Sequence, residues 1–99
     1  MNKNTQPIYA NTFYHIYNRG NNYEKIFFND NNYYYFLNKY DKYLSSVVET
    51  YAYCLIPNHF HLLIKTKDDY ENISEQFRRF FITYSQKINE QENRSGSLF

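Results

Sequence analysis

The chain has 99 residues and a formal net charge of +1, and 13 tyrosines with nine phenylalanines supply most of its 42% hydrophobic content. This length allows one domain with a modest core, and only two glycines and two prolines argue against a disordered chain. The near-neutral charge excludes the strongly basic character common in dedicated nucleic-acid-binding domains.

The first half of the chain predicts a strand followed by a helix. Residues 12–18 are aromatic and β-branched, which favours a strand, and the RGNN segment at 19–22 supplies a polar loop after it. Asn29 or Asp30 is expected to cap a helix whose apolar residues recur at spacings of three and four. This helix is predicted to end near residues 45–46.

The second half predicts a hairpin and a second helix. Residues 47–56 and 59–66 have the composition of strands, and Pro57-Asn58 between them predicts a tight turn. The KDDYEN segment, residues 67–72, is a polar connection to a helix that begins near Ser74. The apolar stripe of that helix is formed by Ile73, Phe77, Phe80, Phe81, Tyr84 and Ile88.

This order of elements predicts an α+β fold: an antiparallel sheet with two helices packed on one face. One further strand would complete the split βαβ pattern of ferredoxin-like folds, and no such strand is evident in the sequence. We expect a single domain over residues 1–99, with an N-terminal tail at 1–11.

Cysteine content and the N-terminal tail predict a cytoplasmic protein. The single cysteine, Cys54, excludes an internal disulfide, and its place in an apolar run predicts a buried thiol. Residues 1–7 are polar and lack the apolar core of a signal peptide, and no segment approaches the roughly 18 apolar residues of a membrane span. We therefore expect no membrane partner.

Two histidines on the predicted third strand are the main functional signal. Side chains alternate between faces along a strand, so His59 and His61 share one face, with Cα atoms about 6.5 Å apart, while Phe60 points to the other. Imidazoles at that spacing can converge on one divalent ion, and His15 can join them if the first and third strands are neighbours. The alternative is that both are polar side chains on an exposed strand face with no further role.

Four segments carry a family resemblance: YHIYNRGN at 14–21, IFFND at 26–30, YAYCLIPNHFHLLIK at 51–65, and ITYSQKIN with RSGSLF at 82–89 and 94–99. They resemble the HUH single-tyrosine transposases, in particular the REP-associated group of the IS200-like superfamily. The resemblance covers residues 12–99 and implies a ferredoxin-like fold that lacks its C-terminal part. The family's H-hydrophobic-H motif falls on His59, Phe60 and His61.

The resemblance implies cleavage of single-stranded DNA near a hairpin. In such enzymes a tyrosine hydroxyl attacks a phosphodiester, forms a 5′-phosphotyrosine link and frees a 3′-hydroxyl. His59 and His61, with His15 as a further candidate, would hold a divalent metal ion, Mg²⁺ or Mn²⁺, with Zn²⁺ as an alternative. The implied partners are single-stranded or hairpin DNA and, for some relatives, a second copy in a homodimer.

The nucleophile is the point where this sequence departs from the family. Relatives carry the tyrosine on a helix after the segment that matches GSLF at 96–99, so we expect the chain to be truncated before it. Tyr84 is the fallback nucleophile, although its position between Phe81 and Ile88 on the apolar stripe favours a core aromatic.

Loop and basic residues supply the candidate DNA contacts. Arg19, Gly20 and Asn21 match the family's NRG loop, which can offer a guanidinium and free backbone N–H groups to a phosphate. Further candidate contacts to the DNA backbone are Lys65, Lys67, Arg78 and Arg79.

Three functions stay open at this point. The chain is a transposase domain that is catalytic when complete, a DNA-binding transposase remnant that does not cleave, or an unrelated ferredoxin-like RNA-binding domain. The last would place aromatic side chains, rather than His59 and His61, at the centre of the exposed sheet face.

Overall fold

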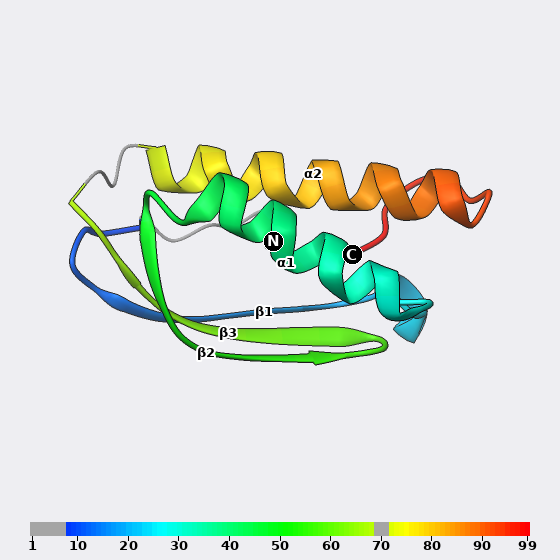
Figure 1. Cartoon of the computed structure of the whole chain (residues 1–99), viewed down its shortest axis with the longest axis horizontal. Helices are drawn as coiled ribbons and strands as arrows, with labels where there is room; N and C mark the ends of the chain where they lie inside the picture. The colour runs from blue at the N-terminus through cyan, green and yellow to red at the C-terminus, as the bar shows by residue number, and fades with distance from the viewer. Residues whose placement is uncertain (1–7, 69–71) are drawn as a thin grey trace.

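The computed structural model describes residues 8–68 and 72–99. The elements in chain order are β1 (Phe13–Arg19), the short 3-10 helix η1 (Asn21–Tyr23), α1 (Asp30–Leu44), β2 (Val48–Ile56), β3 (His59–Thr66) and α2 (Ile73–Gln91). Figure 1 shows both helices on the same side of one sheet, and the described elements leave the opposite side of the sheet uncovered.

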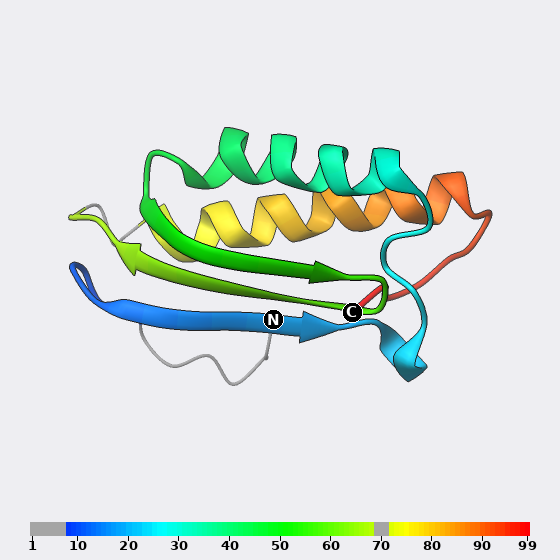
Figure 2. The ribbon, with the colours of Figure 1, turned by 60° about the horizontal axis from the view of Figure 1, so that its bottom comes forward.

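The sheet has three antiparallel strands in the order β1-β3-β2, which confirms the predicted α+β class with an antiparallel sheet and two packed helices. Figure 2 shows β3 between its two neighbours. Tyr17 of β1 and Cys54 of β2 both pair with His61 of β3, so these three residues form one row across the sheet. A β-bulge interrupts the ladder of β2 between Thr50 and Ala52.

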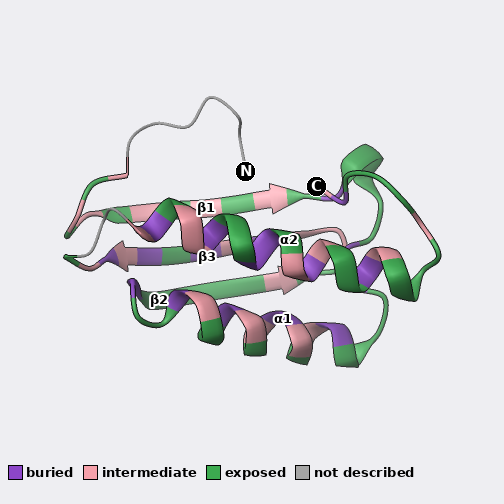
Figure 3. Cartoon of the chain, turned by 90° about the horizontal axis from the view of Figure 1, so that it is seen from above, coloured by how far each residue is buried: buried purple, intermediate pink, exposed green. Residues whose placement is uncertain are grey.

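The core lies between the sheet and the helices. Phe60, Leu62 and Ile64 alternate along β3 and are buried against the helices, each contributing about 1.5–3 kcal/mol through the apolar surface it removes from water. Phe36 of α1 packs against Phe60 and against Phe80 of α2, with ring centroids 5.3 and 4.9 Å apart. Figure 3 shows buried positions that recur along both helices.

The helices and strands lie close to where apolar periodicity and capping residues predicted them. All six residues of the predicted stripe on α2 are buried. Asn29 caps α1 by accepting a hydrogen bond from the backbone N–H of Asn32 at 3.1 Å, and Ser45 ends that helix as predicted. The third strand has the predicted bounds, while the first and second each begin one residue later than predicted.

Two predicted segments fall wholly or partly outside the described residues. These are the first seven residues of the N-terminal tail and residues 69–71 of the KDDYEN connection. In the described part of the chain, neither helix has the length and hydropathy needed to cross a membrane.

Candidate metal and DNA site on the open sheet face

The sheet surface that faces away from the helices is the candidate site, and we call it the open face. Strand alternation and the pairing register place thirteen side chains on it: Phe13, His15, Tyr17 and Arg19 from β1, His59, His61, Leu63 and Lys65 from β3, and Glu49, Tyr51, Ala52, Cys54 and Ile56 from β2. All three histidines of the chain therefore share one surface.

His15 and His61 form a direct pair on this face. His15 pairs with Leu63 and Tyr17 pairs with His61, so the two histidines are diagonal neighbours on adjacent strands, within reach of long side chains. Nε2 of His15 lies 2.8 Å from Nδ1 of His61, with ring centroids 5.0 Å apart and ring planes inclined by 22°. At this distance one ring nitrogen donates a proton and the other accepts it.

His59 shares the face with His61, as predicted, but its ring is differently engaged. Its Nδ1 lies 2.7 Å from Oδ1 of Asn58 in the preceding turn, and its ring stands at 90° to that of His61. The nitrogen pair that the fold brings together is therefore His15 with His61. Within residues 8–68 and 72–99, no three His, Cys, Asp or Glu side chains already form a cluster suited to a metal ion.

The surroundings of His61 favour its neutral form. Partial burial lowers the pKa of this imidazole below its ordinary value, and the neighbouring rings of His15 and His59 lower it further by disfavouring a second positive charge. A neutral imidazole is the form that binds a metal ion.

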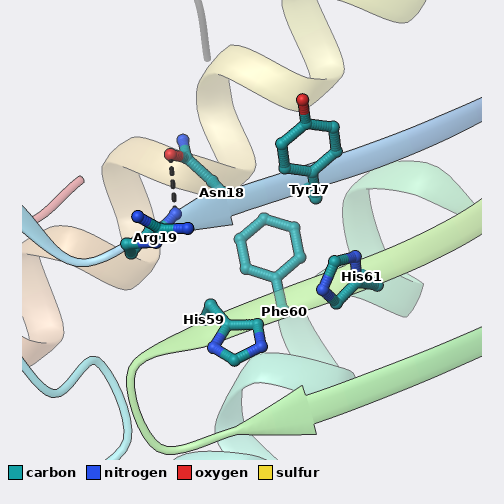
Figure 4. A pocket seen from close by; sticks show the side chains of 6 residues that line it. All are labelled: Tyr17, Asn18, Arg19, His59, Phe60 and His61. Atoms are coloured by element: carbon teal, nitrogen blue, oxygen red, sulfur yellow. Dashed lines mark hydrogen bonds between the residues drawn. The ribbon is translucent and has the colours of Figure 1, made fainter. Parts of the chain in front are cut away.

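A shallow pocket of about 440 Å³ adjoins the histidines. Figure 4 shows the side chains that line it, which are Tyr17, Asn18, Arg19, His59, Phe60 and His61. The ring of Tyr17 is 67% exposed, with its centroid 5.1 Å from His15 and 5.9 Å from His61. Tyr17 was not identified from sequence, although its position two residues after His15 on the same strand indicates a shared face.

Tyr84 lies on the other side of the sheet from the histidines. Its side chain is fully buried among the rings of Phe27, Tyr35 and Phe36, and its hydroxyl donates to the backbone carbonyl of Ile26 at 2.5 Å. Burial raises the pKa of this phenol strongly. These contacts are those of a core residue, as its place on the apolar stripe favours.

The backbone N–H groups of the NRG loop are already used in hydrogen bonds to other segments of the chain. The N–H of Gly20 donates to the carbonyl of Asn58 and that of Asn21 to the carbonyl of Leu98, both at 2.9 Å, so neither N–H is open to a phosphate. A Cβ on Gly20 would stand 2.0 Å from the carbonyl oxygen of Glu24, which explains the glycine. What this loop presents to solvent is the side chains of Arg19 and Asn21.

The candidate basic residues are dispersed over the molecule. Lys65 lies on the open face, with Nζ 5.5 Å from the ring centroid of Phe13. The ammonium of Lys67 donates to the carbonyl of Ser45. Arg78 and Arg79 lie on α2, where both pair with Glu75, on the far side of the sheet from the histidines. Of the predicted phosphate contacts, Arg19 and Lys65 are therefore the cationic side chains that share the surface of the histidines.

The prediction of a buried thiol at Cys54 is wrong. Cys54 is exposed, because it lies on an edge strand and points to the face that no described helix covers. An apolar run indicates that a strand is present, but it does not indicate which face of the sheet is covered by helices.

No protein-family model, curated protein or solved structure matches this chain. The functional proposal therefore depends on the open face and on the residues that the resemblance names.

Proposed function

We propose that this chain is a DNA transposase domain of the HUH single-tyrosine type, which binds single-stranded hairpin DNA beside a divalent metal ion. The observation that carries the proposal is the gathering of three histidines on one uncovered face, with nitrogens of His15 and His61 only 2.8 Å apart. The β-α-β-β-α order and the strand order β1-β3-β2 also support a ferredoxin-like fold.

The donor set of this face suits a divalent ion. Two imidazoles already converge at His15 and His61, and His59 stands next to His61 on the same strand. Imidazole is a common ligand for zinc and manganese, and a site with two or three protein ligands keeps positions open for a substrate oxygen. Lewis-acid stabilisation of charge on a phosphate oxygen is the chemistry that such an ion supplies.

The residues around the pair are suited to hold a phosphodiester there. Arg19 lines the pocket next to His59 and His61, and its guanidinium lies 4.8 Å from the ring centroid of Tyr23. A guanidinium at that position can hold a phosphate by a charge-assisted hydrogen bond. Strands rather than loops carry the histidines, which keeps their separation fixed when DNA binds.

The second candidate function is a DNA-binding domain that does not cleave. The observation that favours it is the burial of Tyr84, the nucleophile candidate named from the sequence, whose hydroxyl donates to the carbonyl of Ile26 inside the core. Cleavage needs a tyrosine hydroxyl that reaches the phosphate beside the histidines. Metal and DNA binding by the open face require no such residue.

One experiment tests the proposal and separates the two functions. A hairpin oligonucleotide with a single-stranded flank is titrated with the protein in the presence of Mn²⁺ or of a chelator, which measures binding. Each mixture is then run on a denaturing gel, which detects a covalent adduct. We expect Mn²⁺ to strengthen DNA binding in the wild type and not in His61→Ala, with Arg79→Ala on the helix side as the matched surface control. A protein-DNA adduct on the gel indicates cleavage, and binding without an adduct indicates the second function. Binding that is equal with and without Mn²⁺ and insensitive to His61→Ala would refute a metal-dependent DNA site on the open face, and no binding at all would refute both functions.

A further inference from the structure

A second exposed cluster lies on the open face, next to the histidine pair. Phe13 and Tyr51 make ring contact with centroids 5.1 Å apart, yet they are 53% and 55% exposed. Leu63 beside them is 42% exposed. We call Phe13, Tyr51 and Leu63 the aromatic cluster. Large apolar side chains that gather and stay exposed indicate a surface that binds something.

The β-bulge in β2 builds this cluster. Tyr51 is the extra residue between Thr50 and Ala52, where the ladder with β3 shifts its register. Phe13 and Tyr51 belong to the two edge strands, whose backbones stand about 10 Å apart across β3. Their rings nevertheless meet, so both lean over the central strand and present flat surfaces to solvent.

The charges around the cluster favour an anionic ligand with flat apolar groups. Lys65 holds its ammonium near the ring of Phe13, and Arg19 lies at the opposite end of β1. Glu49 is the one carboxylate among the side chains of the open face, and it accepts a hydrogen bond from the hydroxyl of Tyr51 at 3.2 Å. Two cations and three imidazoles against one carboxylate suit a phosphate backbone, and exposed rings suit unpaired bases.

We infer that the aromatic cluster is a base-stacking subsite, at which unpaired bases of single-stranded DNA stack on Phe13 and Tyr51. The inference rests on the proposed function in one respect, which is that the same strand places a phosphate beside the histidine pair. Phe13 and His15 are two residues apart on β1, a distance of about 6.6 Å along the strand. A DNA strand that follows β1 therefore contacts the histidines and the aromatic cluster with different nucleotides.

The test compares bases with phosphates. Fluorescence anisotropy measures binding of a twelve-nucleotide oligothymidylate and, separately, of an abasic oligomer with the same number of phosphates. Both measurements use one salt concentration and a chelator. We expect the wild type to bind the oligothymidylate more tightly, and Phe13→Leu and Tyr51→Leu each to lose about 10-fold to 100-fold of that affinity. Tyr51→Phe keeps the ring and should retain binding. Tyr34→Leu removes a ring from α1 that is even more exposed, at 73%, and is the control.

Several results would overturn the inference. Equal affinity for the abasic oligomer would show that phosphates alone are bound, and an equal loss in Tyr34→Leu would show a nonspecific effect. If sedimentation shows that the wild type self-associates and Phe13→Leu does not, the cluster is an interface between two copies. Calorimetry with Mn²⁺ separates this inference from the proposed function. Ring variants that bind Mn²⁺ normally and keep full DNA affinity refute only the stacking subsite, while stacking without any metal binding refutes only the metal-dependent function.

Discussion

His15 and His61 should together form the principal metal-binding pair, so replacing either should weaken metal binding more than replacing His59. Two nitrogens bound to Zn²⁺ at about 2.05 Å with a tetrahedral angle stand about 3.3 Å apart, and with a right angle about 2.9 Å apart. The nitrogens of His15 and His61 are 2.8 Å apart without metal. An increase of at most about 0.5 Å in this distance, together with loss of the shared proton and rotation of both rings toward the ion, therefore converts the hydrogen-bonded pair into a ligand pair.

His59 needs a larger change to join that pair. Its Nδ1 is bound to the side chain of Asn58 at 2.7 Å, and its ring is perpendicular to that of His61. We therefore expect His15→Ala and His61→Ala each to cost at least about 100-fold in affinity for Zn²⁺ or Mn²⁺, which is about 2.8 kcal/mol. His59→Ala should cost about 10-fold or less. Isothermal titration calorimetry of the three variants beside the wild type measures these differences.

The opposite ranking would refute this reasoning. If His59→Ala abolishes metal binding and His15→Ala leaves it unchanged, the H-x-H motif on β3 holds the ion by itself. The hydrogen bond between His15 and His61 would then be unrelated to metal binding. Cys54→Ser is the control for Zn²⁺, because the exposed thiol pairs across the sheet with His61 and is itself a zinc ligand type.

Three further predictions concern single groups. Burial, reinforced by the neighbouring imidazoles, lowers the pKa of His61. The NMR titration of His61 in the presence of a chelator should therefore have a midpoint below about 6.5. His15→Ala should raise that midpoint only in part, because burial is the larger cause of the shift. The unfolded chain then takes up this proton more readily, so stability should fall as the pH drops below about 6.5; a midpoint above that value would contradict this. Gly20→Ala should cost about 1–3 kcal/mol in urea unfolding, since the added Cβ would meet the carbonyl of Glu24, and an unchanged midpoint would show that the loop adapts freely. Tyr84→Phe should lower the free energy of unfolding by about 1–2 kcal/mol, and with it the melting temperature, because it leaves the carbonyl of Ile26 without this donor. DNA and metal binding should stay unchanged. Loss of a protein-DNA adduct in this variant would instead make Tyr84 the nucleophile.

Local pattern accounts for the parts of the fold that could be predicted from the sequence. Helix periodicity and strand alternation depend on residues a few positions apart, so the stripe of α2 and the bounds of β3 could be predicted. The shared face of His59 and His61 follows from the same alternation. Strand order, in contrast, depends on packing between distant segments, and only the structure shows that His15 contacts His61 while His59 turns to Asn58.

The same limit explains the residues that sequence reasoning missed. Tyr51 is on the open face because a bulge adds one residue to β2, and an insertion of this kind leaves no periodic signal. Cys54 is exposed because the helices cover only one side of an edge strand. Tyr17 could have been found from its spacing to His15, but its relation to His61 needed the register of β1 against β3.

That register links the candidate site to the core. A slip of one residue between β1 and β3 would turn His15 toward the helices and Ile16 toward solvent. The slip is opposed by the packing of Tyr14 and Ile16 of β1 against the core on the helix side of the sheet. Backbone hydrogen bonds also fix both ends of the ladder, from Gly20 to the carbonyl of Asn58 and from Thr66 to the carbonyl of Thr12. The packing that stabilises the sheet thus also sets the separation of the two imidazoles, so metal affinity should be lost together with the fold and should not survive as a property of an isolated β3 peptide.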